Sequence, residues 1–495
     1  MKRKTQLAAL AVAGALLLSG CTAATEENPA PSAAPTGTVQ PVQTGTFSLA
    51  YDPKQTMHPI TGTNGANLEL GGLVYQGLYE LDQSFQPQPR LCAGATAGSD
   101  GLTWTVEVAQ GVCFSDGTPL TAAHVVSSLE TARTATRYQN RLSGVTGVAQ
   151  TGTYTLTITL SRPNANLPAL LDIPVVLERE GQDPLGTGPY LLQDGALVPN
   201  PYSGLVDALP AETIPLVEVS TPDRRKAAFD SGEVWMATTQ FSDPQAVGYS
   251  GTCEVFDYPT SQLLYLGFQT QRGVCADAAV RQRISSALNR DSLVQVQLSG
   301  HGDPTLWPIS PAWGELPEWT QGGTEESTGG SLTLIVNEDN STRQQVAQAV
   351  ANQLEGAGFT VTVKSLAWED YVSALERGNF DLYLGQVQLT SDFDLTALLT
   401  GALSYGGVQS EVQELLNAWR RTGGETELEA YLAGFAQQTP LAPICFLRGS
   451  LLVRWGLVTG VAPTQANPYS DVDQWTIWSS VEDKNAGIQQ QDKDK

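Results

Sequence analysis

The chain has 495 residues, with 51 acidic and 27 basic side chains and a formal charge of -24 at pH 7. It has no basic cluster beyond its first residues, which argues against nucleic acid or an anionic lipid surface as its ligand. Between its two polar ends lie roughly 435 residues, too many for one hydrophobic core, so we expect two or three packed units.

The first residues have the layout of a secretion signal. Lys2, Arg3 and Lys4 precede an apolar stretch at 7–18 that is too short to span a bilayer comfortably. The segment Leu-Leu-Leu-Ser-Gly-Cys at 16–21 resembles a bacterial lipobox, which implies cleavage before Cys21 and acylation of its thiol. Several acyl chains at one site give durable anchoring. We therefore expect a protein on the outer face of the cytoplasmic membrane, attached only through Cys21; an uncleaved anchor with a chance cysteine is the alternative.

Both ends of the mature chain are expected to be unstructured. Residues 22–46 consist mainly of Ala, Pro, Thr, Gly and Gln, and this composition is typical of a flexible linker. Residues 481–495 are rich in Gln, Asp and Lys, and we expect them to be a disordered tail.

Five cysteines remain after Cys21, so at least one is unpaired, and their connectivity cannot be read from the sequence. Cys92 and Cys113 flank an expected strand pair, which makes them our first choice for a disulfide. The chain has three histidines and no closely spaced cysteines, so we expect neither a metal centre nor another cofactor.

In chain order, residues 103–108 and 153–160 alternate apolar and polar side chains with period two, which predicts two strands with one buried face each. Between them, a turn at 115–119 leads to Thr121, which is placed to cap a helix running through Leu129. Further on, a strand at 331–336, a helix at 342–354 and a strand at 359–364 predict a right-handed parallel unit. A helix at 368–375 and a strand at 380–384 follow. The fold class is therefore α/β.

Seven segments then carry a family resemblance in chain order. The most distinctive reads Gly-Val-Cys-Phe-Ser-Asp-Gly-Thr-Pro-Leu-Thr-Ala at 111–122, and Gly-Thr-Gly-Pro-Tyr follows at 186–190. The others are at 57–59, 73–79, 280–291, 300–304 and 378–382. Together they resemble the family 5 extracellular solute-binding proteins of ABC transporters, the group that binds dipeptides, oligopeptides and nickel. His124 and Arg283 depart from the family pattern, as helix-surface changes.

The resemblance implies a two-lobed periplasmic-binding-protein-like fold of type II, with a ligand cleft between the lobes. The first lobe would comprise residues 47–261, with an extra subdomain at about 85–163. The second would comprise 262–444, and residues 445–480 would return to the first.

Site residues follow from the same resemblance. In peptide binders an aspartate after the second-lobe strand pairs with the ligand's amino group, and Asp392 or Asp394 matches it, with Asp394 favoured. The tryptophan and proline usual in that loop are absent, and both aspartates could instead cap a helix at 395–399. Trp307 lies in a Gly/Pro loop, where it could line the pocket or pack on the loop itself. The weaker candidates are Tyr405, Tyr51 and His58, although a lone histidine beside a proline is more often structural.

These features imply a monomeric receptor that captures a solute, most readily a short peptide, and delivers it to the permease subunits of an ABC importer. A nickel chelate or an oligosaccharide is the alternative ligand. A secreted hydrolase is more remote, because the Gly-x-Ser-x-Gly, His-Glu-x-x-His and Ser-x-x-Lys motifs are missing; only a paired-carboxylate mechanism stays open.

Overall fold

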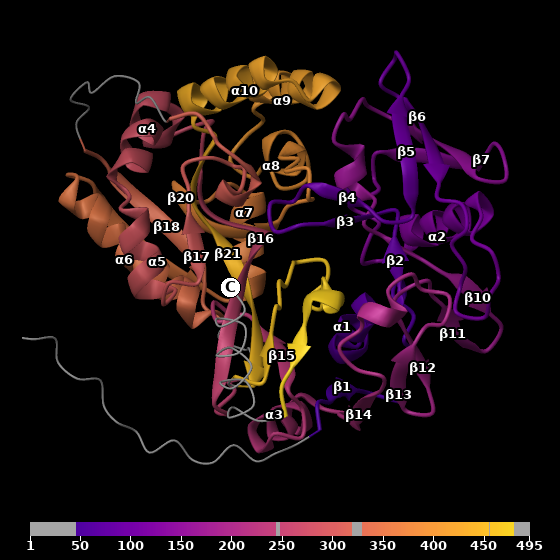
Figure 1. Ribbon diagram of the computed structural model, residues 1–495. Coiled ribbons are helices and arrows are strands. Elements are labelled where there is room, and N and C mark those ends of the chain that lie inside the picture. Colours follow the sequence, from indigo (N-terminus) through magenta and orange to yellow (C-terminus); the bar gives the residue numbers. More distant parts are fainter. Residues whose placement is uncertain (1–45, 244–247, 319–328, 455, 480–495) are drawn as a thin grey trace, which may run out of the picture. The chain divides into compact units, whose positions relative to one another are not determined.

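The computed structural model describes residues 46–243, 248–318, 329–454 and 456–479, and shows a mixed α/β fold (Figure 1). The lipobox at 16–21, nearly all of the 22–46 linker and the 481–495 tail lie outside the described residues. No helix in the described ranges is long and apolar enough to cross a membrane.

A four-stranded antiparallel sheet contains the two strands that the alternating apolar and polar side chains predict. Its strands, in spatial order, are β5 (Cys92–Ala97), β6 (Thr103–Val108), β8 (Thr155–Leu160) and β7 (Val145–Gln150). Trp104 and Val106 of β6 and Leu156 and Ile158 of β8 point into one buried cluster, so both predicted strands are confirmed. We call this group of buried side chains between Ile60 and Val175 the N-terminal cluster.

The helix α2 (Ala122–Thr134) covers this cluster and begins where the sequence predicts. The backbone N–H of Thr121 donates to Nδ1 of His124 at 3.1 Å, so His124 closes the first turn of the helix. Its departure from the family pattern therefore has a local structural role. Partial burial lowers the pKa of His124, which favours the neutral ring that accepts this bond.

A second sheet contains β1 (Leu49–Tyr51), β14 (Ile214–Glu218), β13 (Ala196–Pro199) and β12 (Tyr190–Gln193), with β1 and β14 parallel. The helices α1 (Gly65–Val74) and α3 (Pro222–Ser231) lie beside this sheet (Figure 1). The turn before β12 passes so close to α1 that a Cβ on Gly186 would lie 2.0 Å from the carbonyl oxygen of Val74. This contact explains the Gly-Thr-Gly segment as a backbone requirement.

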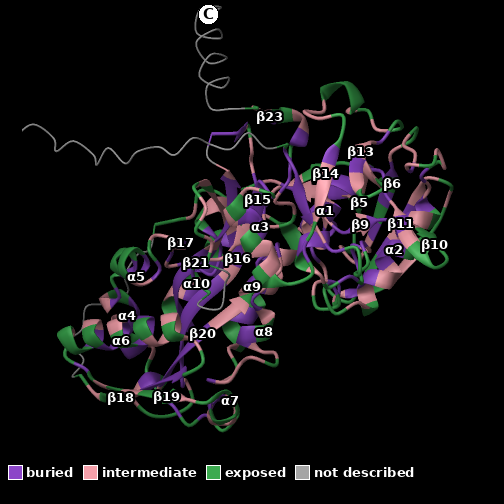
Figure 2. Ribbon diagram, turned by 90° about the horizontal axis from the view of Figure 1, so that it is seen from below, coloured by how far each residue is buried: buried purple, intermediate pink, exposed green. Residues whose placement is uncertain are grey.

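The largest sheet has seven strands in the described part of the chain. Its main order is β15 (Met236–Thr239), β21 (Leu441–Arg454), β16 (Cys253–Phe268), β20 (Leu382–Gln388), β18 (Ser331–Asn337) and β19 (Thr360–Leu366), and β17 (Gly302–Pro304) pairs with β21. The predicted lobe boundaries at 261/262 and 444/445 fall inside β16 and β21. Figure 2 shows buried residues along β16, β20 and β21.

The predicted strand-helix-strand unit is confirmed, since β18 and β19 are parallel and joined by α6 (Ser341–Gly356). The strand predicted at 380–384 forms two residues later, as β20, and also runs parallel to β18. Asp381, just before β20, already bonds to the neighbouring segments: its N–H donates to the carbonyl of Thr333 at 3.1 Å, and its Oδ2 accepts the N–H of Thr333 at 2.8 Å.

Helices cover both faces of the large sheet. On one face, the cluster that contains Leu266, Ile284 and Val350 packs under α4 (Ala278–Ala287), α5 (Arg290–Gln297) and α6. On the other face, an aromatic cluster contains Trp307, Phe393, Phe446 and Trp419. The helices of that face are α7 (Trp368–Glu376), α8 (Thr396–Leu399), α9 (Ser410–Thr422) and α10 (Glu425–Gln438). We call this second group the aromatic cluster.

Four short strand pairs complete the fold. They are β2 (Gln76–Gly77) with β9 (Pro174–Val175), β3 (Tyr79–Leu81) with β4 (Pro87–Pro89), β10 (Leu177–Arg179) with β11 (Gln182–Leu185), and β22 (Val458–Thr459) with β23 (Thr476–Ile477). The β3–β4 hairpin starts in the N-terminal cluster at Tyr79 and carries Phe85 into the aromatic cluster.

The predicted Cys92–Cys113 disulfide is wrong, because the five described cysteines all have free thiols. Cys92 pairs with Val108 in the sheet, and its buried Sγ donates to the hydroxyl of Tyr79 at 3.2 Å. Cys113 lies beyond β6, in a turn where it pairs with Pro119. Flanking a strand pair therefore did not bring the two thiols together.

Candidate ligand-binding site

A cavity of about 560 Å³ opens where segments from distant parts of the chain meet. Its walls come from the end of α1, the strands β2 and β3, the segment after α2, the loop 465–473 and the end of β20. Its charged lining residues are Glu80, Arg90, Arg137, Arg141, Asp172, Asp471 and Asp473, and its neutral polar lining includes Gln76, Asn140, Gln388, Thr390, Gln465 and Asn467. This volume suits a small solute with several polar groups.

Two arginines of the segment after α2 form a basic part of the wall. Arg141 is paired with Asp172, whose side chain is 3% exposed. Burial raises the pKa of Asp172, and the Arg141 charge opposes that shift. The guanidinium carbons of Arg137 and Arg141 lie 5.6 and 5.3 Å from the ring centroid of Tyr138. Within the described residues, Arg137 is exposed and has no hydrogen-bond or carboxylate partner.

A second charged group is mainly acidic. The Nε of Arg90 donates to Oε2 of Glu80 at 2.7 Å, and its Nη2 lies 3.4 Å from Oδ1 of Asp471. The amide of Asn467 donates to the other oxygen of Glu80 at 3.0 Å. Partial burial and the nearby Glu80 charge raise the pKa of Asp471. With Asp473, this part of the lining has three carboxylates and one guanidinium.

A neutral network links the cavity to the long strand β16. The backbone N–H of Ser261 donates to Oε1 of Gln465 at 2.5 Å, and its hydroxyl donates to the carbonyl of Leu389 at 2.7 Å. Gln388 donates to the same hydroxyl at 2.6 Å. The buried Ser261 therefore joins three lining residues at the position where the sequence predicts a crossing between lobes.

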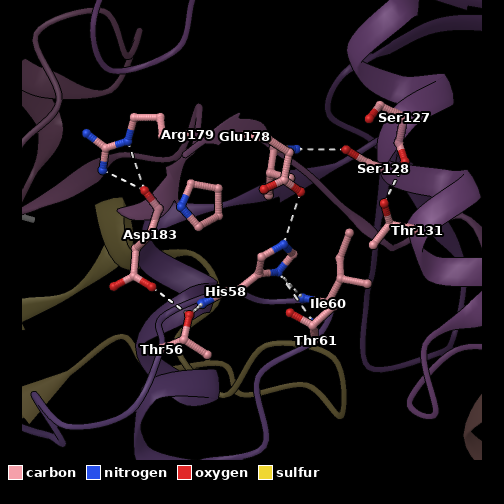
Figure 3. Close-up of polar contacts among 12 residues, drawn as sticks. Thr56, His58, Ile60, Thr61, Ser127, Ser128, Thr131, Glu178, Arg179 and Asp183 are labelled. Carbon is pink, nitrogen blue, oxygen red and sulfur yellow. Dashed lines mark hydrogen bonds and ion pairs between the residues drawn. The ribbon is translucent and has the colours of Figure 1, made fainter. Parts of the chain in front are cut away.

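Among the described residues that line this cavity, none of the six predicted ligand contacts is found. His58 instead holds a loop in place (Figure 3). Its Nδ1 accepts the N–H of Ile60 at 3.2 Å, so Nε2 carries the proton and donates to Oε1 of Glu178 at 3.1 Å. Beside it, the Thr56 hydroxyl donates to Asp183 at 2.6 Å. These contacts fit the structural alternative for His58.

Two of the three aromatic candidates, Trp307 and Tyr405, pack in or against the aromatic cluster. Trp307 is 7% exposed in the aromatic cluster, and its indole N–H donates to the carbonyl of Pro317 at 2.9 Å. Tyr405 packs against the same cluster, with its ring centroid 6.3 Å from that of Tyr383. Tyr51 ends β1 and is partly buried, and burial followed by the nearby charge of Asp183 raises its pKa.

Asp392 and Asp394 both pair with one internal cation. Arg420 of α9 places Nη2 3.1 Å from Oδ2 of Asp392 and Nη1 2.5 Å from Oδ2 of Asp394. Oδ1 of Asp394 also accepts the N–H of Thr396, the first residue of α8, at 2.9 Å, although Leu395 occupies the N-cap position itself. Both aspartates therefore already have a cationic partner within the chain, although one guanidinium offsets only one of their two charges.

The sequence did contain a signal for the basic wall. Arg133, Arg137 and Arg141 recur every four residues in a chain with only 27 basic side chains. Arg133 pairs with Glu130 and does not contribute to the cavity lining among the described residues, whereas the other two do. The chain bends after α2 ends at Thr134, so the spacing alone could not show which arginines face the cavity.

Residues 86–407 match the bacterial extracellular solute-binding proteins, family 5, and the chain belongs to this family. It is therefore a solute-binding receptor of the ABC-transporter type, and the expected family is confirmed. Within the described residues, no three His, Cys, Asp or Glu side chains gather as a metal site would require.

Individual relatives have different ligands. The glutathione-binding protein GsiB of Escherichia coli (strain K12) is 26% identical over 344 residues, which cover 63% of this chain and 67% of the relative. The oligopeptide-binding protein AppA of Bacillus subtilis, solved with a nonapeptide, shares 18% identity at a TM-score of 0.55, covering 88% of this chain and 100% of that one. NikA of Brucella suis, solved with Fe(III)-EDTA, shares 17% identity at a TM-score of 0.63, covering 87% and 99%. At these identities the structural matches confirm the two-lobed α/β fold.

Proposed function

We propose that this chain is a lipid-anchored extracytoplasmic receptor that binds short peptides in the 560 Å³ cavity and delivers them to an ABC permease. The observation that carries the choice of ligand is the presence of both charge types in one lining. Arg137 offers a cation, and the group around Glu80 has an excess of carboxylates. A short peptide with free ends carries a carboxylate, which would pair with Arg137, and an ammonium, which would pair with the carboxylates around Glu80.

The arginine would receive the peptide's carboxylate. Arg141 is already paired with Asp172, but Arg137 keeps its guanidinium available beside it. A guanidinium and a carboxylate form a charge-assisted, often bidentate, pair that is stronger than a neutral hydrogen bond. The cation–π contact with Tyr138 would hold the guanidinium in position for it.

The acidic group would receive the peptide's ammonium. Arg90 compensates one of the charges of Glu80, Asp471 and Asp473, which leaves a net charge of about -2 beside the cavity when all four groups are ionised. Burial, and then the nearby charge of Glu80, raise the pKa of Asp471. A bound ammonium would relieve the repulsion.

A metal chelate that carries carboxylates, as in the solved NikA complex, would also suit Arg137, so chelates remain the second candidate. The two differ in what they offer the acidic group, because a carboxylate-rich chelate has no free ammonium. Oligosaccharides carry no charge for either group, so both groups would lose water without gaining an ionic partner, which costs binding energy.

A thermal-shift screen tests the ligand class. Di- to pentapeptides with free ends should raise the melting temperature, whereas the same peptides acetylated at the amino end and amidated at the carboxyl end should raise it less. Nickel with histidine and a maltooligosaccharide provide the competing classes. Stabilisation by one of these classes and by no peptide would overturn the peptide assignment.

A further inference from the structure

The loop 390–395, between β20 and α8, contacts two segments that belong to the N-terminal part of the fold. On one side, the ring of Phe393 meets the ring of Phe85 from the β3–β4 hairpin, with centroids 5.1 Å apart at an angle of 78°. Phe85 and Phe393 are 3% and 0% exposed, and both belong to the aromatic cluster. The hairpin therefore inserts a side chain into the cluster that covers the large sheet.

Both phenylalanines have left-handed backbones, with φ of 59° for Phe85 and 52° for Phe393. Bulky residues rarely adopt this conformation, and it persists where the surroundings impose it. At the hairpin, Oδ1 of Asp82 accepts the N–H groups of Ser84 and Gln86 at 2.8 and 2.9 Å. In the loop, the N–H of Phe393 donates to the carbonyl of Thr390 at 2.9 Å. Two tight turns thus hold their rings toward each other.

The second contact is polar. Asn164, which follows β8 and is 4% exposed, donates from Nδ2 to Oδ2 of Asp392 at 2.9 Å. The N–H of Ala165 donates to the carbonyl of Arg420 at 2.6 Å, and Arg420 in turn pairs with Asp392. A Cβ on Gly423, at the end of α9, would lie 3.1 Å from Cβ of Ala165, so the two backbones approach closely.

The same loop also reaches the cavity. Thr390 lines it, and its hydroxyl donates to Oδ1 of Asp392 at 2.5 Å. Asp392 is 3% exposed, and each of its oxygens has a partner: Thr390 on Oδ1, and Asn164 and Arg420 on Oδ2. A continuous chain of contacts therefore runs from the cavity wall through Asp392 to Asn164, and through the neighbouring Phe393 to Phe85.

We propose that residues 390–395 form a latch that holds the β3–β4 hairpin and the segment 164–166 on the large sheet as one unit, with Thr390 as its end in the cavity. In this arrangement Asp392 is a positioning residue. It acts through Asn164 and Arg420. A ligand in the cavity would contact Thr390, and this contact rests on the proposed function. The latch itself does not depend on that function.

Hydrogen exchange of the protein without added ligand, followed by mass spectrometry, tests the latch. The reporter is the peptide that contains the Ala165 amide, which donates its hydrogen bond to the carbonyl of Arg420. If the loop acts as one unit, Phe85→Ala should speed exchange at 163–167 about tenfold, and Thr390→Val, which removes the hydroxyl at nearly constant volume, should do the same. Thr390→Ser should restore the slow rate.

Two controls separate the latch from general loosening. Val296→Ala changes a side chain that is 68% exposed on α5, and it should leave the rate at 163–167 unchanged. Exchange in β8, at 155–160, should stay slow in every variant, because that strand belongs to the N-terminal cluster. Wild-type exchange at 163–167 in Phe85→Ala, or in Thr390→Val, would show that the contacts are independent and overturn the proposal.

Discussion

Phe85 and Phe393 meet edge to face, 5.1 Å between ring centroids, and each reaches this contact through a positive φ. Such a backbone costs about 1–3 kcal/mol at each residue. Burying a phenylalanine gains about 1.5–3 kcal/mol, and an edge-to-face pair adds about 0.5–1.5 kcal/mol. The free energy gained from this contact can therefore offset the cost of the two left-handed backbones, but only while both rings are present.

Removing one ring should consequently destabilise the protein. We expect Phe85→Ala to lower the free energy of unfolding in urea by about 3 kcal/mol, because a cavity forms and the left-handed backbone stays. Val296→Ala, at an exposed position, should change it by less than about 0.5 kcal/mol. Equal stability of the Phe85 variant and wild type would show that the ring adds nothing to the folded state.

Arg137 should govern the affinity for a ligand carboxylate. Arg137→Ala is expected to weaken binding of a free-ended peptide by about 1.5–3 kcal/mol, as measured by calorimetry, and to have less effect on the same peptide with an amidated end. Arg133→Ala is the matched control, since Arg133 pairs with Glu130 and is not among the described lining residues. Equal losses in the two variants would argue against a carboxylate contact at Arg137.

Asp394 should contribute to stability more than to binding. Asp394→Asn breaks its pair with Arg420 but can keep the bond to the Thr396 N–H, so we expect a loss of about 2 kcal/mol in unfolding free energy and little change in peptide affinity. A large loss of affinity with unchanged stability would instead support the role that the family resemblance implies, pairing with the ligand's amino group.

Asp230 should give the protein part of its acid sensitivity. Partial burial acts to raise its pKa, but Lys226 and the N–H and hydroxyl of Ser250 outweigh burial and lower the pKa to about 2. Its stabilising effect is therefore complete above the unfolded pKa near 4 and is lost as the pH falls toward 2. In Asp230→Asn, melting temperatures should fall less steeply between these pH values. A slope identical to wild type would contradict the assignment.

Cys21 should decide where the protein is found. Cys21→Ser removes the thiol that a lipid would modify, so the variant should leave the membrane fraction, and metabolic labelling with a fatty acid should be lost. Membrane association and labelling that persist in the variant would exclude Cys21 as the anchor.

Local patterns predicted the fold well where one element decides its own structure. The alternation at 103–108 and the capping position at Thr121 appear in the structure as β6 and α2. The strand predicted at 380–384 begins at Leu382, and Asp381 just before it already bonds to Thr333 through both its backbone N–H and its side chain. Thr333 lies 48 residues away, so a local sequence pattern does not contain this partner.

The site was harder to predict, since it depends on contacts between distant segments. The family pattern drew attention to Asp392 and Asp394, but it could not show that both form ion pairs with Arg420. Arg137 belongs to no family segment that we recognised, and its place in the cavity depends on the bend after α2. Cys92 and Cys113 show the same limit, because flanking the same strand pair does not fix where their side chains point.

A crystal structure with a free-ended peptide, chosen as the one that most raises the melting temperature, tests the central claim most directly. The account predicts the peptide in the 560 Å³ cavity, its carboxylate within hydrogen-bond distance of Arg137, and Arg420 still paired with Asp392 and Asp394. A peptide whose ammonium has displaced Arg420 from these aspartates, with Arg137 left without contact, would contradict it.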